Sequence, residues 1–203
     1  MKKEIYIIRH GETDFNQLGI VQGRGVDSSL NETGRKQAQH FFDTYKDAGF
    51  QKIFVSTLKR THETIAPFRA LGIPIIAHEG LDEISWGIHE GKKDGDTFKD
   101  FYRVLHAWQH GETDLAIDDG ESPITVQQRQ LRFLDELTAS GEDRILICSH
   151  GRAIRILMCT MLKKPLSEMD TFPHQNTSLY KMIYDGNSFA TDLFNDITHL
   201  HAT

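Results

Sequence analysis

Two histidines and two arginines occupy positions where their side chains could act together on one anion. Arg9-His10-Gly11 and Ser149-His150-Gly151 each follow an apolar run, and Arg60 lies a few residues after a third run. Guanidinium groups pair with phosphate oxygens through two parallel N–H donors. A neutral imidazole is nucleophilic near neutral pH and can attack phosphorus without a strong base to activate it. These residue types therefore predict binding of a tetrahedral oxyanion and covalent transfer through a histidine.

The apolar runs predict buried strands, and the amphipathic stretches between them predict helices. We expect strands over residues 5–8, 53–55, 73–77 and 144–149, and a closing hairpin over 179–184 and 189–194. We expect helices over about 33–45, 57–71, 96–109 and 122–140, and a last helix that begins near 151 and ends before 165. Loops are expected over 11–32 and 78–95.

Two prolines give local signals about the helices. Pro67 lies inside the segment 57–71, where a proline removes a backbone donor, so we expect a kink or an early end there. Ser122 followed by Pro123 is a strong helix start, because serine caps a helix and proline is favoured at its first position.

Strands that alternate with helices predict a three-layer α/β/α sandwich with a mainly parallel central sheet. No linker rich in proline or serine divides the chain, so residues 1–203 are predicted to form a single domain. Ligands of such sheets bind outside the carboxyl ends of the strands. Three separate segments should therefore deliver the two histidines and two arginines to one edge, and the helix near Gly151 can direct its N–H groups to the same anion.

Composition narrows the classes of partner. The chain has 203 residues and a net charge of −6, which argues against nucleic acid or an anionic membrane as the main partner. Cys148 and Cys159 lie in apolar runs and belong to no CxxC pair, so buried free thiols are favoured. No apolar run approaches the length of a membrane span or of a signal-peptide core, which predicts a cytoplasmic location. No metal-binding motif is present, and no metal or cofactor is expected.

An ordered set of motifs resembles the histidine phosphatase superfamily, which includes the cofactor-dependent phosphoglycerate mutases. The motifs span most of residues 4–155, in the family order and at plausible spacing. In chain order they are Ile7-Ile8-Arg9-His10-Gly11-Glu12-Thr13-Asp14-Phe15-Asn16, Val21-Gln22-Gly23, residues 30–38, Ser56-Thr57-Leu58-Lys59-Arg60-Thr61, Leu81-Asp82-Glu83, Gly87, Glu90-Gly91, Gly120-Glu121-Ser122 with Arg129, and Ser149-His150-Gly151. The resemblance implies a phosphoglycerate mutase-like fold.

The resemblance also implies a role for each site residue. His10 takes the phosphoryl group as a phosphohistidine, while Arg9, Arg60 and His150 hold the phosphate. Glu83 protonates the leaving oxygen and then, as a carboxylate, activates the water that frees the enzyme. Asn16, Gln22, Gly23 and Gly151 would line the same pocket, although Asn16 could simply cap a turn and Gln22 could be an exposed loop residue.

The assignment of the acid has alternatives. The segment after Glu83 has Trp86 and His89 where the family often has other residues. Asp82 and Glu90 are nearby carboxylates that could take the same role.

Three functions are compatible with this set. A phosphomonoester hydrolase acting on a small phosphorylated metabolite is the leading hypothesis. A mutase, which returns the phosphoryl group to the substrate, is the first alternative, but Glu83 and Glu121 are only 38 positions apart, which leaves less material to enclose a bisphosphate cofactor than in glycolytic mutases. A non-catalytic interaction protein is the second alternative, and the intact set of catalytic residues argues against it. Selectivity is expected to come from 84–119, and a homodimer is the default assembly.

Overall fold

The central sheet places β1 in its middle. A computed structural model describes residues 2–93, 95 and 98–201. Within them the sheet has six strands in the order β3-β2-β4-β1-β5-β6. The strands are β1 (Lys3–Arg9), β2 (Lys52–Val55), β3 (Ile75–Ala77), β4 (Arg144–Ser149), β5 (Leu179–Tyr184) and β6 (Phe189–Asp196). The first four run parallel, and β5 pairs antiparallel with both β1 and β6.

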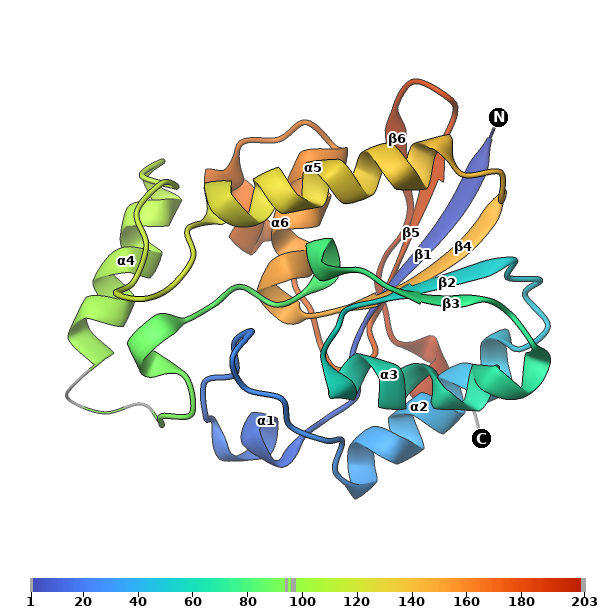
Figure 1. The fold of residues 1–203 in the computed structure, drawn as a ribbon, viewed down its shortest axis with the longest axis horizontal. Helices are drawn as coiled ribbons and strands as arrows, with labels where there is room; N and C mark the ends of the chain where they lie inside the picture. Colours follow the sequence, from blue (N-terminus) through green and yellow to red (C-terminus); the bar gives the residue numbers. More distant parts are fainter. Residues whose placement is uncertain (1, 94, 96–97, 202–203) are drawn as a thin grey trace.

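Helices cover both faces of the sheet, which gives three layers (Figure 1). One face packs against α4 (Lys99–Gln109), α5 (Pro123–Ala139), α6 (Gly151–Met161) and the 3₁₀ turn η5 (Leu166–Thr171). The other face packs against α2 (Glu32–Tyr45), α3 (Lys59–Ile65) and η1 (Ala66–Leu71). Alternate residues of β1 enter the two cores: Ile5 and Ile7 face α6, whereas Tyr6 and Ile8 face α2. The predicted mainly parallel α/β sandwich is confirmed.

Capping side chains and a proline set the helix boundaries close to the positions expected from the sequence. The Ser122 side chain accepts from the Thr125 N–H and caps α5, with Pro123 at its first position. The Asn31 side chain caps α2 by accepting from the Gly34 N–H. The helix expected over 57–71 is divided, because α3 ends at Ile65 and the segment with Pro67 continues as the 3₁₀ helix η1.

Some elements differ from the expectation. The segment predicted as a loop after His10 contains a short helix, α1 (Asp14–Leu18), and the segment 78–95 contains the 3₁₀ turns η2 (Glu79–Leu81) and η3 (Gly87–His89). The turn η6 (Thr198–His201) follows β6. These elements have at most five residues, too few for a hydrophobic period to be visible in the sequence. The predicted start of α4 at Asp96 lies outside the described residues.

Candidate active site

Strand register brings the two histidine motifs together at the carboxyl edge of the sheet. β1 and β4 are parallel neighbours, and Arg9 pairs with Ser149 at the end of both strands. The His10 N–H donates to the Ser149 carbonyl over 3.0 Å, so pairing continues up to the first histidine. The ring centroids of His10 and His150 are 5.2 Å apart. The two histidines therefore lie side by side.

Hydrogen bonding and burial leave the Nε2 atom of His10 unprotonated. Its Nδ1 lies 2.7 Å from the Gly11 carbonyl oxygen. A carbonyl can only accept, so Nδ1 carries the proton and Nε2 has the lone pair. Burial is the largest cause that lowers the pKa of His10 well below its ordinary value, and the charges of Arg60 and Arg9 lower this pKa further. The ring is therefore neutral near neutral pH, which is the nucleophilic form.

His150 is hydrogen-bonded at both ring nitrogens. Its Nδ1 accepts from Arg60 Nε over 3.1 Å, and its Nε2–H donates to the Ser56 hydroxyl over 2.7 Å. The Arg60 side chain is fully buried, and its Nη1 donates to the Val26 carbonyl over 2.6 Å. Burial is the largest cause that lowers the pKa of Arg60, and nearby carboxylates act in the opposite direction. His150 thus holds the buried guanidinium of Arg60 close enough to His10 for its charge to lower the pKa of that ring.

Arg9 presents a buried donor, its Nε atom, beside the first histidine. Its Nη1 lies 3.2 Å from His174 Nδ1, and its Nε has no hydrogen-bond partner among the described residues. Burial lowers the pKa of Arg9 to about 10, with Glu83 opposing this shift and Arg60 and Arg155 adding to it. Arg9 is therefore still charged at neutral pH. A buried, unpaired N–H on a cation favours a bound anion at this position.

A cavity of about 310 Å³ opens beside these groups, at the lower end of the range for ligand pockets. We call it the α6 cavity, and its lining comprises Arg9, Glu83 and Gly151, the apolar Trp86, Phe101 and Leu105, and the basic Arg152, Arg155 and His174. His10 has only 3% of its surface exposed, and Arg60 and His150 have none. Of the predicted catalytic residues, Arg9 and Glu83 therefore line the α6 cavity, whereas His10, Arg60 and His150 are buried behind its wall.

The Glu83 carboxylate caps the N-terminus of α6. Its Oε2 accepts from the Arg152 N–H over 3.1 Å, and its Oε1 accepts from the Ala153 N–H over 2.9 Å. A carboxylate is favourable at this end of a helix because the unpaired N–H groups and the helix dipole both attract negative charge. The cap fixes the acid on the wall of the α6 cavity, next to Gly151.

The two alternative carboxylates are engaged elsewhere. Asp82 accepts from the Thr57 N–H over 2.8 Å and pairs with Arg24 over 3.1 Å. Glu90 accepts from the Trp86 N–H over 2.9 Å through its Oε1 atom. Neither carboxylate lines the α6 cavity. Glu83 therefore has the better position for an acid that meets substrate.

Asn16 and Gln22 lie around the first histidine motif. The Asn16 Oδ1 accepts from Asn176 Nδ2 over 3.2 Å, and the same amide donates to the His10 carbonyl over 3.0 Å. Asn16 also completes the capping box of α1 with Thr13, so the capping alternative applies to it. The Gln22 amide donates to the Thr13 hydroxyl over 2.8 Å. Gln22 therefore contacts Thr13, a residue of the first histidine motif, and neither histidine ring is among its hydrogen-bond partners.

The two predicted pocket glycines are required for close packing. A Cβ at Gly23 would lie 1.9 Å from Glu90 Oε1, and the Gly23 carbonyl accepts from Arg60 over 3.4 Å. A Cβ at Gly151 would lie 2.8 Å from His174 Cε1. Gly23 therefore supports Arg60, whereas Gly151 makes room for the histidine that contacts Arg9.

A buried ion pair holds the segment that carries the acid. Arg129 Nε donates to Glu121 Oε1 over 3.1 Å, and the two side chains are 9% and 15% exposed. The Nη atoms of Arg129 donate to the carbonyls of Glu79, Gly80 and Glu83 over 3.0 to 3.1 Å. We call this pair and its bonds the Arg129 clamp. It attaches the main chain of Glu83 to α5.

Two residues near the first histidine motif lie outside every motif found in the sequence. Asn176 donates to the His10 carbonyl, and His174 contacts the side chain of Arg9. Ser56, which contacts His150, lies inside the motif that contains Arg60. His174 and Asn176 come from the irregular segment before β5, which has no recognisable pattern. Arg152 and Arg155 could have been found, because they lie in the helix that opens directly after the second histidine motif.

Comparison with known proteins identifies the family to which this chain belongs. The model of branch 1 of the histidine phosphatase superfamily matches residues 5–197. The chain belongs to the histidine phosphatase superfamily. Its relatives are named phosphatases and phosphoglycerate mutases, so this member of the superfamily is an enzyme of the phosphatase or phosphoglycerate mutase-like type.

Individual relatives align over nearly the whole chain. A probable phosphatase of Schizosaccharomyces pombe is 30% identical over 98% of this chain and 96% of its own length. The probable phosphoglycerate mutase GpmB of Erwinia tasmaniensis is 28% identical over the same shares. The solved structure of YhfR from Bacillus stearothermophilus is 30% identical, covers 98% of this chain and 99% of its own, and superposes with a TM-score of 0.88.

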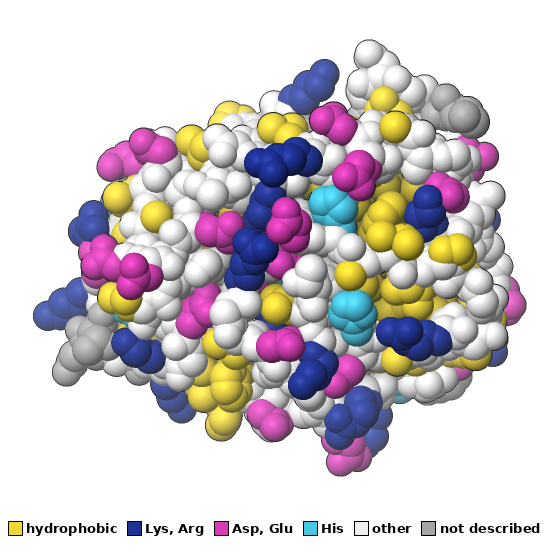
Figure 2. Space-filling model, in the orientation of Figure 1, with side chains coloured by type: hydrophobic (Ala, Val, Ile, Leu, Met, Phe, Trp, Pro, Cys, Tyr) yellow, Lys and Arg dark blue, Asp and Glu magenta, His cyan; other side chains and the backbone are white. Residues whose placement is uncertain are grey.

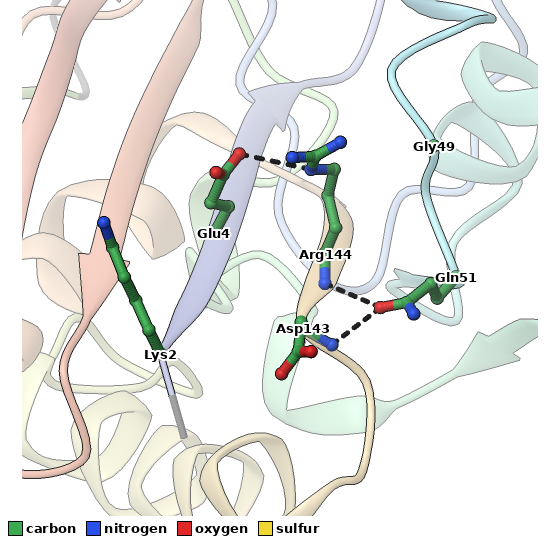
Figure 3. Close-up of a pocket in the computed structure, with 6 residues that line it drawn as sticks. All are labelled: Lys2, Glu4, Gly49, Gln51, Asp143 and Arg144. Carbon is green, nitrogen blue, oxygen red and sulfur yellow. Dashed lines mark hydrogen bonds and ion pairs between the residues drawn. The ribbon is translucent and has the colours of Figure 1, made fainter.

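A second cavity lies at the opposite edge of the sheet, where β1 and β4 begin (Figure 3). It has a volume of about 280 Å³, and the Glu4 carboxylate on its wall pairs with Arg144 over 3.2 Å. Gln51 accepts from the N–H groups of Asp143 and Arg144 over 2.7 and 2.9 Å. No candidate catalytic residue lines it.

The described residues show neither a membrane-spanning helix nor a metal cluster. No helix among them is long and apolar enough to cross a bilayer. No group of three or more His, Cys, Asp and Glu side chains in this part of the chain is placed to hold a metal ion. Figure 2 shows basic and acidic side chains interspersed over the face it presents, without a broad region of one sign.

Proposed function

We propose that this histidine phosphatase is a phosphomonoester hydrolase that works through a phosphohistidine on His10. The observation that supports this most strongly is the hydrogen bond from His10 Nδ1 to the Gly11 carbonyl. It leaves Nε2 unprotonated beside the cationic Arg9 and Arg60, which lower the pKa of the ring. A neutral nucleophile next to fixed positive charge is what attack on a dianionic phosphate requires.

In the first half of the reaction, His10 Nε2 attacks phosphorus and a P–N bond forms. The ester P–O bond breaks, and its electron pair goes to the leaving oxygen. Glu83 gives a proton to that oxygen. Arg9 and Arg60 stabilise the charge on the phosphoryl oxygens, and the Gly151 N–H is the amide of the first turn of α6 that Glu83 does not take.

In the second half, the Glu83 carboxylate removes a proton from water, and the oxygen attacks phosphorus. The P–N bond breaks, its electron pair returns to His10 Nε2, and inorganic phosphate leaves. His150 orients Arg60 throughout, and the Nε2–H that it gives to Ser56 is the donor that it can offer to a phosphate oxygen. Asn16, Gln22 and Gly23 act by supporting the loops around His10 and Arg60. No metal or cofactor takes part in these steps.

The test of this mechanism is hydrolysis of 4-nitrophenyl phosphate in the presence of a chelator. His10→Ala should abolish the activity, whereas His40→Ala, at an exposed position on α2, should not change it. Rapid quenching at alkaline pH should trap acid-labile phosphate on His10. Full activity of His10→Ala, or acid-stable phosphate on another residue, would refute the mechanism.

A mutase is the alternative that the relatives keep open, since they include probable phosphoglycerate mutases as well as phosphatases. The short separation of Glu83 and Glu121 favours hydrolysis, because little chain is available to shield a phosphohistidine from water. Incubation with 3-phosphoglycerate, with and without 2,3-bisphosphoglycerate, distinguishes the two. Isomerisation faster than phosphate release would establish the mutase.

We propose a small phosphorylated metabolite as the substrate. The α6 cavity has a volume of about 310 Å³, which suits a compact molecule. One solved relative, 26% identical with a TM-score of 0.83, is a phosphoserine phosphatase from Entamoeba histolytica in complex with 3-phosphoglyceric acid. The single domain, the cytoplasmic location and the homodimer stay predictions from the sequence.

A further inference from the structure

The main chain around His10 is held, on the side opposite β4, by the residues that lead into β5. The Asn176 amide donates to the His10 carbonyl over 3.0 Å, and the Thr177 N–H donates to the Arg9 carbonyl over 3.1 Å. We call residues 174–178 the entry segment. Its conformation therefore determines where the proposed nucleophile and the neighbouring cation lie.

Thr177 has a strained backbone conformation. Its φ is 58°, in the left-handed region that glycine adopts freely but that crowds the branched Cβ of a threonine. Such a residue keeps this conformation only where its surroundings impose it. The Thr177 side chain is fully buried. Relaxation of the strain would turn the backbone of the entry segment and move the Asn176 amide away from the His10 carbonyl.

The side chain of His199 supplies a restraint on Thr177. Its Nε2 lies 3.2 Å from the Thr177 hydroxyl oxygen. His199 belongs to η6, the turn after β6, which packs against α2 (Figure 1). Its ring is 1% exposed and lies edge-on to the rings of Phe41 and Tyr45, with centroids 5.2 and 6.2 Å away. A rigid group of the core therefore contacts the strained residue.

Hydrogen bonding defines the tautomer of His199. Burial lowers the pKa of His199 to about 4, so the ring is neutral at neutral pH and one nitrogen carries a proton. Nδ1 is buried and has no hydrogen-bond partner among the described residues. A buried acceptor without a partner is tolerated more readily than a buried donor without one, so the proton lies on Nε2. His199 thus donates to the Thr177 hydroxyl, and its unpaired Nδ1 has a cost that a leucine in this apolar site would not have.

We propose that His199 and Thr177 are positioning residues for phosphoryl transfer. The hydrogen bond between them holds the entry segment in its strained conformation, and this segment in turn holds the main chain of Arg9 and His10. The inference rests on the proposed hydrolase function and adds η6 to the parts of the molecule that the reaction requires. Neither His199 nor Thr177 lines the α6 cavity, so both act through the entry segment and not by contact with substrate.

Substitutions of His199 test the hydrogen bond. His199→Leu fills the apolar site but removes the donor, and kcat for 4-nitrophenyl phosphate should fall about tenfold or more, because a displaced nucleophile loses its alignment. KM should stay within about twofold of the wild-type value, since the side chains that line the α6 cavity are unchanged. His199→Gln places an amide N–H near the position of Nε2 and should restore kcat to within about threefold of the wild type. A wild-type kcat in His199→Leu, or equal losses in both variants, would overturn the proposal.

A matched control separates loss of stability from loss of position. Phe68→Leu shortens a fully buried side chain whose ring contacts Phe41, Phe42 and Phe50 and no described residue of the entry segment. Because it leaves a cavity in the same core, it should lower the free energy of unfolding more than His199→Leu does. Its kcat should nevertheless match the wild type at a temperature at which circular dichroism shows both variants folded. Equal losses of kcat in Phe68→Leu and His199→Leu would show a general structural effect and overturn the positioning role.

Thr177→Gly removes the hydrogen bond and the strain together. Glycine adopts a positive φ without steric cost, so the relief of strain offsets the lost packing, and the urea midpoint should stay close to that of the wild type. The glycine also gives the entry segment access to other conformations, and kcat should fall about tenfold, as for His199→Leu. A variant that is stable but slow cannot be explained by unfolding. Full activity of Thr177→Gly would contradict the proposal.

The imidazole nitrogens of His10 give a readout that does not need hydrolysis. In nitrogen NMR spectra of the wild type, Nδ1 should carry the proton, as its contact with the Gly11 carbonyl requires, and His10→Ala identifies the signals. His199→Leu should shift this pattern toward a mixture of tautomers, and an unchanged pattern would overturn the positioning role. A folded wild type that hydrolyses no phosphomonoester would overturn the proposed function alone, since a shifted pattern would still establish the link from η6 to His10.

Discussion

Removal of the Arg129 side chain tests how Glu83, the proposed acid, is held in position. Arg129→Met keeps most of the apolar length of the side chain but removes every donor of the Arg129 clamp. The Glu121 carboxylate, 15% exposed, then loses its buried partner, and the carbonyls of Glu79, Gly80 and Glu83 each lose a hydrogen bond. We expect both a loss of stability and a displacement of Glu83 from the α6 cavity.

The magnitude follows from the groups left unpaired. Breaking a buried ion pair by removing one partner costs about 3–5 kcal/mol, and the unpaired carbonyls are part of that cost. This is a large share of the roughly 5–15 kcal/mol that stabilises a typical domain. Catalysis should fall by about tenfold or more, because a catalytic group displaced by a fraction of an ångström loses its alignment.

Urea unfolding followed by circular dichroism measures the first effect, and kcat for 4-nitrophenyl phosphate measures the second. Arg103→Met removes an exposed arginine that pairs only with Asp100 on α4, and it should change the free energy of unfolding by less than about 0.5 kcal/mol. The double variant Arg129→Met/Glu121→Met should regain part of the lost stability, since it leaves no buried charge. A loss below about 1 kcal/mol in the single variant, or a double variant that is less stable than it, would refute the reasoning.

Three further changes have definite expected outcomes. Gly151→Ala should lower kcat/KM for an aryl phosphate about tenfold, because the added Cβ would lie 2.8 Å from the His174 ring and must displace it from Arg9; steady-state kinetics that match the wild type would contradict this. Ser56→Ala should lower the free energy of unfolding by about 1–3 kcal/mol, since the buried Nε2–H of His150 loses its acceptor, and urea titration measures this loss. His199→Leu should flatten the dependence of stability on pH. Burial lowers the pKa of His199 to about 4, so as the pH falls below about 6.5 the unfolded chain binds a proton that the folded chain refuses. The wild type should lose up to about 1.4 kcal/mol per pH unit from this residue between pH 6.5 and 4, and equal slopes in thermal melts of the two proteins would exclude this origin.

The sequence predicts the sheet and the main helices because their signals are local. An apolar run such as 144–149 matches β4 at both ends, and the Ser122–Pro123 signal marks the start of α5. The helix α1 was missed because its five residues, Asp14–Leu18, have no buried side chain and therefore no hydrophobic period. The capping box of Thr13 and Asn16 marks the start of this helix. Both residues belong to the first histidine motif, which ends at Asn16.

The candidate site is only partly predictable, because its residues reach it in two ways. Arg9 ends β1, and His10 and His150 directly follow β1 and β4, so the parallel topology alone brings them together. His174 and the Trp86 ring reach the cavity from irregular segments, whose paths depend on packing between distant parts of the chain. The sequence shows neither the tautomer of His10 nor the orphan donor of Arg9, since both depend on contacts made only after folding.

The central position of β1 has a consequence for the order of events in the cell. The first strand to leave the ribosome leads directly into His10, the proposed nucleophile, yet its two neighbours in the sheet, β4 and β5, begin at Arg144 and Leu179. Contacts this distant in sequence form slowly and cannot form at all before the later segments have been made. The His10 imidazole therefore acquires its buried, oriented state only when synthesis is almost complete. A nascent or truncated chain that lacks the last strands should have no hydrolytic activity.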